Sequence, residues 1–178
     1  ADAGSSLNAS CNYLGSLNAN TIGYGNTAIG LCALGGNTTG NSNTAIGCYA
    51  MKNVTTGSCN VAIGNNALYG GTNPNGNHNV GIGSFALYSM GYGNHNVAIG
   101  CQTLCKSCGN SNIGIGQNSL KANTTGCDNT AFGFSALLNN TTGINNTAIG
   151  YQAGYSSTSS NSAWASTFVG YKAGIAAQ

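Results

Sequence analysis

The residues that could do chemistry in this 178-residue chain are eight cysteines, two histidines and very few charges. The carboxylates are Asp2 and Asp128, the cations are four lysines, and there is neither Glu nor Arg. Acid–base catalysis by paired carboxylates would require Asp2 and Asp128 to meet, and no pattern in the sequence brings them together. We therefore expect a non-enzymatic protein. A net charge of +2 from scattered lysines also argues against a nucleic-acid partner.

The cysteines are even in number, which in a chain with a small core fits four disulfides formed in an oxidising compartment. Free thiols in a reducing cytosol are the alternative. The triplet Cys101-x3-Cys105-x2-Cys108 has the spacing of an iron–sulfur site. The rest of such an enzyme is absent, so we expect no cofactor.

The histidines, His78 and His95, lie in identical Gly-Asn-His-Asn-Val strings, one period of the sequence repeat apart. Two imidazoles on neighbouring repeats could share a metal, which makes them weak candidate ligands. The same place in other repeats holds Ser42, Cys59, Ser111, Asp128 and Asn145. That variety favours a tolerant, exposed position produced by repeat duplication.

Most of these residues lie within a sequence repeat, which defines their spacing along the chain. Asn-Thr-Ala-Ile-Gly or a close variant ends at Gly30, Gly47, Gly64, Gly83, Gly100, Gly116, Gly133 and Gly150. A looser copy ends at Gly170, and a degenerate copy, Asn20-Thr21-Ile22-Gly23, precedes the series. A period of about 17 residues is too short for helical repeats and predicts an all-β parallel solenoid of about nine coils.

The columns of the aligned repeats predict how each coil is built. The leading asparagines should form a hydrogen-bonded ladder from coil to coil. Small and large residues alternate in the string, which is the period-two pattern of a strand, and an Ala-Leu column after the glycine marks a second short strand or a bend. If the small alanines point inward, a large apolar column points outward and needs a covering partner: Ile29, Ile46, Ile63, Ile82, Ile99, Ile115, Phe132 and Ile149. We favour this oligomer interface over a self-sufficient coil with Ile and Leu both inside, because monomers rarely expose so long an apolar stripe.

The coil spacing also suggests which cysteines pair and which asparagines carry glycans. Cys32 with Cys48, and Cys108 with Cys127, lie at nearly equivalent places in adjacent coils, within disulfide reach. The other four cysteines remain unassigned. Several Asn-x-Ser/Thr sequons fall at a Thr-Thr-Gly corner that a solenoid should expose. The candidates are Asn8, Asn37, Asn53, Asn123, Asn139, Asn140 and Asn145.

The string Gly-x-x-Asn-Thr-Ala-Ile-Gly-x-x-Ala at 40–50 and 143–153 resembles the head repeats of trimeric autotransporter adhesins. It is also similar to repeats in tail-fibre-like proteins of phages, large algal viruses and bacterial surfaces. The resemblance covers about residues 20–178. It implies a left-handed β-roll, assembled as a trimer with the Ile-bearing faces inward, in an extracellular fibre or adhesin.

We therefore expect a structural or adhesive segment at a cell or virion surface, with itself as partner in a homotrimer or end-to-end filament, and a receptor or glycan as a further partner. No apolar run is long enough to enter a bilayer. An ice-binding solenoid is the alternative, because regular Thr columns on a small disulfide-bonded solenoid would suit it. We expect an N-terminal degenerate coil over 1–25, solenoid repeats over 26–155, and a Ser-rich insertion with a last coil over 156–178.

Overall fold

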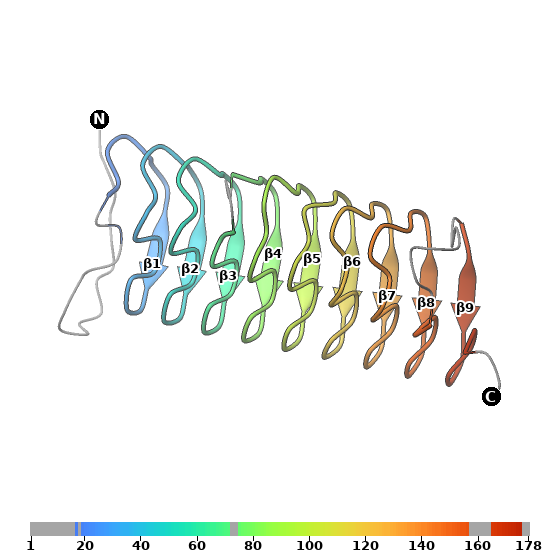
Figure 1. Cartoon of the computed structure of the whole chain (residues 1–178). Helices are drawn as coiled ribbons and strands as arrows, with labels where there is room; N and C mark the ends of the chain where they lie inside the picture. Colours follow the sequence, from blue (N-terminus) through green and yellow to red (C-terminus); the bar gives the residue numbers. More distant parts are fainter. Residues whose placement is uncertain (1–16, 18, 72–74, 157–164, 176–178) are drawn as a thin grey trace.

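The computed structural model describes residues 17, 19–71, 75–156 and 165–175. Within them the chain forms a rod of stacked coils, with one three-residue strand per coil and the two ends of the chain at opposite ends of the rod (Figure 1). The strands are β1 (Thr27–Ile29), β2 (Thr44–Ile46), β3 (Val61–Ile63), β4 (Val80–Ile82), β5 (Val97–Ile99), β6 (Ile113–Ile115), β7 (Thr130–Phe132), β8 (Thr147–Ile149) and β9 (Thr167–Val169). They pair in parallel and in chain order within a single sheet. The predicted all-β parallel solenoid is confirmed.

The pairing register follows the repeat. Ala28 lies beside Ala45 and Ile29 beside Ile46, and every later pair of strands keeps equivalent residues opposite each other. Insertions between strands, such as the one that lengthens the coil between β3 and β4, therefore leave the sheet register unchanged. Eight steps of about 4.8 Å make the sheet about 38 Å long.

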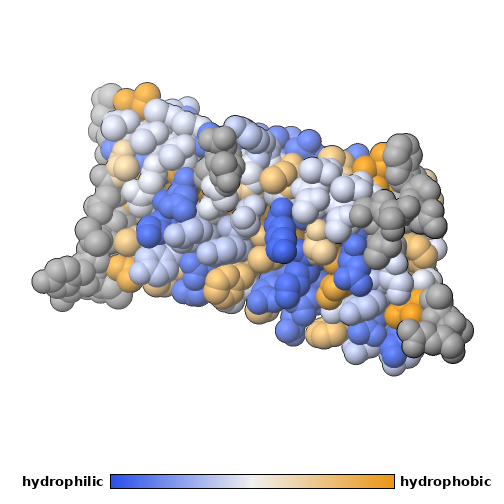
Figure 2. All heavy atoms as spheres, in the orientation of Figure 1, coloured by the Kyte–Doolittle hydropathy of each residue, from blue (hydrophilic) through white to orange (hydrophobic). Residues whose placement is uncertain are grey.

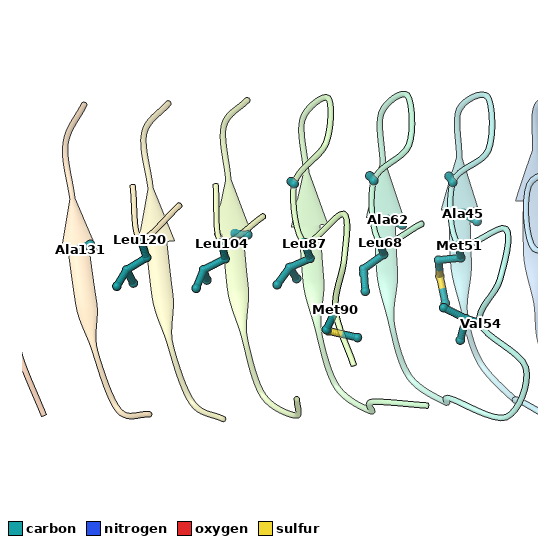
Figure 3. Packing of buried hydrophobic residues seen from close by; sticks show 14 of the residues in the cluster. Ala45, Met51, Val54, Ala62, Leu68, Leu87, Met90, Leu104, Leu120 and Ala131 are labelled. Carbon is teal, nitrogen blue, oxygen red and sulfur yellow. The ribbon is translucent and has the colours of Figure 1, made fainter. Parts of the chain in front are cut away.

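Small and large side chains fill the narrow interior in alternation. The middle residue of β1 to β8 is Ala or Gly and is buried. Val54 and Met90 are buried near the corner, and the other large apolar side chains of the interior come from the turns after β1 to β7, four residues past the motif glycine: Leu34, Met51, Leu68, Leu87, Leu104, Leu120 and Leu137, all fully buried. We call this set the leucine column, and Figure 3 shows its members at the same place in successive coils. So short a coil closes because a small residue at the strand centre faces each large side chain of the leucine column.

The segment after each strand is a turn rather than a second strand. Its second and fourth residues adopt left-handed backbone, as in Gln102 (φ 56°) and Leu104 (φ 49°). The motif glycines have φ between 119° and 137°. A Cβ at Gly100 would lie 2.8 Å from the backbone carbon of Gly116, so the glycine allows adjacent coils to stack closely at this bend.

The predicted asparagine ladder is confirmed. Asn96 donates its backbone N–H to Asn79 Oδ1 (2.9 Å) and its side-chain amide to the same oxygen (3.1 Å) and to the carbonyl of Gly109 (2.8 Å). Asn112 donates to Asn96 in the same way. The ladder holds the start of a coil to its own end and to the neighbouring coil.

The expectation that Asn20-Thr21-Ile22-Gly23 is a degenerate copy of the strand string is wrong. Asn20-Thr21-Ile22-Gly23 is equivalent to the corner Asn37-Thr38-Thr39-Gly40 and not to a strand. Asn37 Nδ2 donates to Asn20 Oδ1 (3.0 Å), and the amide of Thr21 donates to Thr38 O (2.9 Å). Leu17 donates to Ala33 O in the register of the leucine column. Residues 17 and 19–25 are thus the second half of a preceding coil.

Candidate interaction face

The outer surface of the sheet is an apolar strip. Because β1 to β8 bury their middle residues, the first and third residues of each strand face outward. The first-residue column is Val61, Val80, Val97 and Ile113 across β3 to β6 and Thr in β1, β2, β7, β8 and β9. The third-residue column is Ile29, Ile46, Ile63, Ile82, Ile99, Ile115, Phe132, Ile149 and Val169. We call the two columns together the strand strip. The outward orientation of the isoleucines is confirmed, and the alternative that they fill the interior is wrong.

The side chains of the strand strip are half-buried or exposed, and the most exposed ones lie from β3 toward β9. Ile63 and Ile99 are each 37% exposed, Phe132 is 54% and Val169 is 65%. Two columns about 7 Å apart over nine strands cover roughly 300 Å². Patches of that size are often functional in soluble proteins. Figure 2 shows one long face of the rod, on which hydrophilic side chains are interspersed with small separate apolar groups.

An aromatic ladder that sequence reasoning missed follows the last three strands. Phe134 stacks on Tyr151 and Tyr151 on Tyr171, with ring centroids 5.3 Å apart in both pairs. Each of these residues immediately follows the motif glycine after β7, β8 or β9. This shared position in the repeat could have predicted the ladder from the sequence. Tyr69 and Tyr88 form a second stack at 5.1 Å. Phe134, Tyr151 and Tyr171 are all exposed.

The cysteines form no disulfide among the described residues. Cys48, Cys59, Cys101, Cys105, Cys108 and Cys127 carry free thiols, and Cys11 lies outside the described residues. The reason lies in the register: Tyr49 rather than Cys48 is beside Cys32, since the Tyr49 amide donates to Leu31 O. Likewise Asn110, not Cys108, is beside Cys127, and its amide donates to Cys127 Sγ (3.3 Å).

The histidines stack as neighbours in one exposed column. His78 and His95 have ring centroids 5.0 Å apart and an interplanar angle of 1°. No group of three or more His, Cys, Asp or Glu side chains converges to hold a metal ion anywhere in the described part of the chain. Asp128 is exposed in the same column, two coils beyond His95, and Asp2 lies outside the described residues.

The sequons divide into buried and exposed asparagines, which corrects the expectation that the corner exposes them. Asn37, Asn123 and Asn140 point into the coil and are 0–1% exposed. Their side-chain amides donate to the glycine carbonyl three residues on, at 2.9–3.2 Å. A glycan has no room there. Asn53 and Asn145 are exposed.

The other two sequons lie elsewhere. Asn139 is half-buried and its amide donates to Tyr155 O (3.0 Å). Asn8 lies outside the described residues.

In the described residues no helix is long and apolar enough to cross a membrane. Comparisons with protein families, with curated proteins and with solved structures found no match to this chain.

Proposed function

We propose that this chain is a non-enzymatic structural segment of an extracellular fibre or adhesin, in which the strand strip joins copies of the chain into a homotrimer. Its role is to supply length and surface attachment at a cell or virion surface, with a receptor or glycan as the further partner. The observation that carries the proposal is the strand strip, whose third-residue column is apolar in all nine strands and whose first-residue column is apolar over β3 to β6.

The physical argument is that the strip is both apolar and regular. Over β3 to β6 every outward side chain is Val or Ile, and water contact of such side chains costs about 25 cal/mol per Å². The strip is only two columns wide. Two chains packed with their strips face to face would therefore bury less surface area than a stable dimer needs. Three narrow strips facing a common axis would cover one another more completely. The resemblance to trimeric adhesin heads supports the same arrangement.

Light scattering behind size exclusion tests the proposal. The expected mass is three times the 17.7 kDa of the chain. The double variant Ile63→Lys/Ile99→Lys places two charges on the strip and is expected to give a folded monomer. A wild-type monomer would contradict the trimer. Material in the void volume would contradict it too and indicate an end-to-end filament.

A charge-matched control separates the strip from a general effect of added lysines. Thr56→Lys/Thr125→Lys adds the same charge at exposed corner positions on two coils. This variant is expected to keep the wild-type mass. If both double variants dissociate equally, the strip is not the interface.

A second candidate, ice binding, is favoured by one feature of the same face. Thr27, Thr44, Thr130, Thr147 and Thr167 occupy the first-residue column at the two ends of a regular, in-register sheet. The corner residues Thr38 and Thr124 do not add to such a surface, because each hydroxyl donates to a carbonyl of the next coil. A difference between the freezing and melting temperatures of a solution of the protein would support this candidate, and coincident temperatures would exclude it.

A further inference from the structure

Asn75 differs from every other asparagine of this Asn-rich chain in being followed directly by glycine. The pair matters chemically, because the backbone nitrogen of the next residue can attack the side-chain carbonyl carbon of an asparagine. A glycine at the next position has no Cβ to obstruct that approach. The sequence therefore singles out one side-chain amide for an intramolecular reaction.

The stacking of the coils fixes the glycine at position 76. Its carbonyl accepts the side-chain amide of Asn60 (2.9 Å), and a Cβ on Gly76 would overlap the carbonyl oxygen of Gly93. Glycine occupies the same place in the other described coils, whereas the residue before it varies: Ile22, Thr39, Thr56, Asn75, Tyr92, Cys108, Thr125 and Thr142. The fold thus retains a glycine after whichever residue precedes it, and in the coil between β3 and β4 that residue is asparagine.

The side-chain oxygen of Asn75 accepts two hydrogen bonds from the preceding coil. Thr55 Oγ1 donates to it at 2.8 Å and the Thr56 backbone N–H at 3.3 Å. One coil earlier, the equivalent donors on Thr38 and Thr39 go to a backbone carbonyl, that of Thr55. The Asn75 side chain therefore takes the place of a main-chain acceptor at this corner, and two donors polarise its carbonyl group.

We propose that Asn75 is a self-modification site, at which the side chain cyclises onto the Gly76 nitrogen and is converted to aspartate or isoaspartate. The Gly76 N–H is available for the reaction, because it donates to no acceptor among the described residues. Its nitrogen loses the proton and attacks Asn75 Cγ. The negative charge that develops on Oδ1 is stabilised by the Thr55 hydroxyl and the Thr56 N–H.

The remaining steps need only water. The bond between Cγ and Nδ2 of Asn75 breaks, and ammonia leaves with the proton that Gly76 lost. Water then opens the cyclic imide at one of its two carbonyl carbons. Opening between Cγ and the Gly76 nitrogen gives aspartate, whereas opening between that nitrogen and the main-chain carbonyl carbon gives isoaspartate.

The two products should differ in their effect on the corner. Aspartate adds a negative charge to a chain with two acidic side chains, and its oxygen can still accept the hydrogen bonds from Thr55 and Thr56. Isoaspartate lengthens the main chain just before Gly76, whose carbonyl holds Asn60 in the asparagine ladder. We therefore expect isoaspartate to loosen this coil. The site lies at the corner and outside the strand strip, so it does not depend on the proposed function.

Incubation of the folded, full-length chain in mildly alkaline buffer tests the site. Peptide mapping by mass spectrometry, with enzymatic methylation of isoaspartate as a second readout, should show Asn75 converting at least about tenfold faster than any other asparagine. Asn75→Thr, which reproduces the corner residue Thr56, should remove the signal. Asn77→Ser, which reproduces Ser58 at the equivalent place one coil earlier, is the matched control and should leave the rate at Asn75 unchanged.

Variants of Thr55 test whether the fold assists the reaction. Thr55→Val removes the hydroxyl donor and should slow conversion several-fold in the folded chain, whereas Thr55→Ser keeps the hydroxyl and should react as the wild type does. In concentrated urea all three chains should react at one rate, because no donor is then held in place. Conversion of Asn75 no faster than that of other asparagines in the folded wild type would overturn the site. Equal rates in folded Thr55→Val and wild type would overturn the role of Thr55.

Discussion

The ring of Phe168 in β9 occupies the space that a side chain at Gly154 would need. A Cβ at Gly154 would lie 2.9 Å from Phe168 Cδ2 and 2.8 Å from Leu137 Cδ2, and a Cβ at Gly174 would also collide with the ring. In the other coils the strand centre is Ala or Gly and the leucine column supplies the bulk. In the last coil the large and small residues change places. Phe168 stands at the strand centre, where the other strands have Ala or Gly, and Gly154 and Gly174 stand where the other coils have a member of the leucine column.

The exchange predicts compensation between Phe168 and Gly154. Phe168→Ala should lower the free energy of unfolding by about 2 kcal/mol, because a half-buried ring leaves a cavity. Gly154→Leu alone should also destabilise, through overlap with the ring and with Leu137 Cδ2. The double variant restores the composition of the other coils and should recover most of the loss. Urea denaturation at one protein concentration measures all three.

Backbone strain does not limit the Gly154→Leu change. Gly154 has φ 62°, and Leu137, one coil earlier, already adopts φ 50° at the equivalent place. Hydrogen exchange at the Gly170 amide, which donates to Ile149 O, reports on the same coil independently. Additivity of the two single changes within about 0.5 kcal/mol would show that the sizes are not coupled.

Two glycines at equivalent strand positions should respond to alanine in opposite directions. A Cβ at Gly81 in β4 would lie no closer than 3.4 Å to any neighbour, among them Ala86 O. A Cβ at Gly114 in β6 would lie 2.7 Å from Thr103 Cγ2 and 3.1 Å from Ser119 Oγ. Gly81→Ala should stabilise by about 0.5–1 kcal/mol. Gly114→Ala should destabilise the protein by about 1–3 kcal/mol. The same change should cost less in a Thr103→Ala background, because the Thr103 methyl group is then absent.

Thermal unfolding of Gly81→Ala, Gly114→Ala and Gly114→Ala/Thr103→Ala in parallel checks the sign of each change. The result that would contradict the packing argument is the same sign for Gly81→Ala and Gly114→Ala, since both residues occupy the middle of a strand.

The asparagine ladder should be sensitive to truncation in the middle of the rod. Asn96→Ala removes the donor to Gly109 O and the acceptor for Asn112, and it takes the side-chain donor away from Asn79 Oδ1. All these groups are buried, so the expected cost is about 3 kcal/mol. Chemical denaturation measures it.

A surface asparagine provides the control for the ladder. Asn110 is exposed, and its Oδ1 accepts the Asn94 amide (2.8 Å). Ser58 holds the equivalent place and accepts the Asn41 amide (3.0 Å). Asn110→Ser should therefore change stability by less than about 0.5 kcal/mol. Equal losses at Asn96 and Asn110 would mean that burial does not decide the contribution.

The strand register, the asparagine ladder and the outward isoleucines could be predicted from the sequence because all three follow from a period that every coil repeats. The corner could not. The sequence around Asn37 is typical of an exposed turn. Its side chain points inward because its amide donates to the carbonyl of Gly40, and the position of that carbonyl depends on the folded backbone. Val54, inward at the same place in the next coil, leaves Asn37 Oδ1 without a donor.

The disulfide expectation shows a second limit of spacing arguments. The separation of Cys32 and Cys48 along the chain falls one residue short of the register between β1 and β2, so each cysteine lies beside a different residue of the adjacent coil. A difference of one residue along a β-type ladder changes which side chains meet. The stacked pair of His78 and His95, by contrast, was predictable because their spacing equals the register.

Glycan occupancy should follow the burial of the sequons. When the chain is secreted from a eukaryotic host, glycopeptide mass spectrometry of the folded product should find glycans at Asn53 and Asn145 and none at Asn37, Asn123 and Asn140. The reason is that the last three amides donate inside the coil. Asn53→Gln should remove one glycoform without loss of secretion. A glycan on any of the three buried asparagines in folded protein would contradict the packing of the corner.

Thiol labelling without reductant should separate the cysteines by exposure. Cys59, Cys101 and Cys108 are exposed and should react rapidly with iodoacetamide, whereas Cys105 is half-buried. Burial raises the pKa of the Cys105 thiol above its usual range, although the nearby Lys121 opposes the shift. The thiolate is the reactive form, so Cys105 should label slowly near neutral pH. Its labelling rate should rise as the pH approaches the raised pKa of this thiol.

Replacing Lys121 tests the electrostatic part of this effect. Lys121→Gln removes a positive charge near Cys105, so the pKa of that thiol should rise further and its labelling should slow by a few-fold. Lys172→Gln, on the last described coil, is the control and should leave the rate unchanged.

The raised pKa of Cys105 also links stability to pH, because the folded protein holds the thiol proton more tightly than the unfolded chain does. The contribution of this group to stability is complete at a pH below the pKa of the thiol in the unfolded chain. It is lost as the pH rises through the pKa of the thiol in the folded protein. Labelling of Cys105 as fast as Cys108 at every pH would contradict the burial, and cysteines that react only after reduction would restore the disulfide hypothesis.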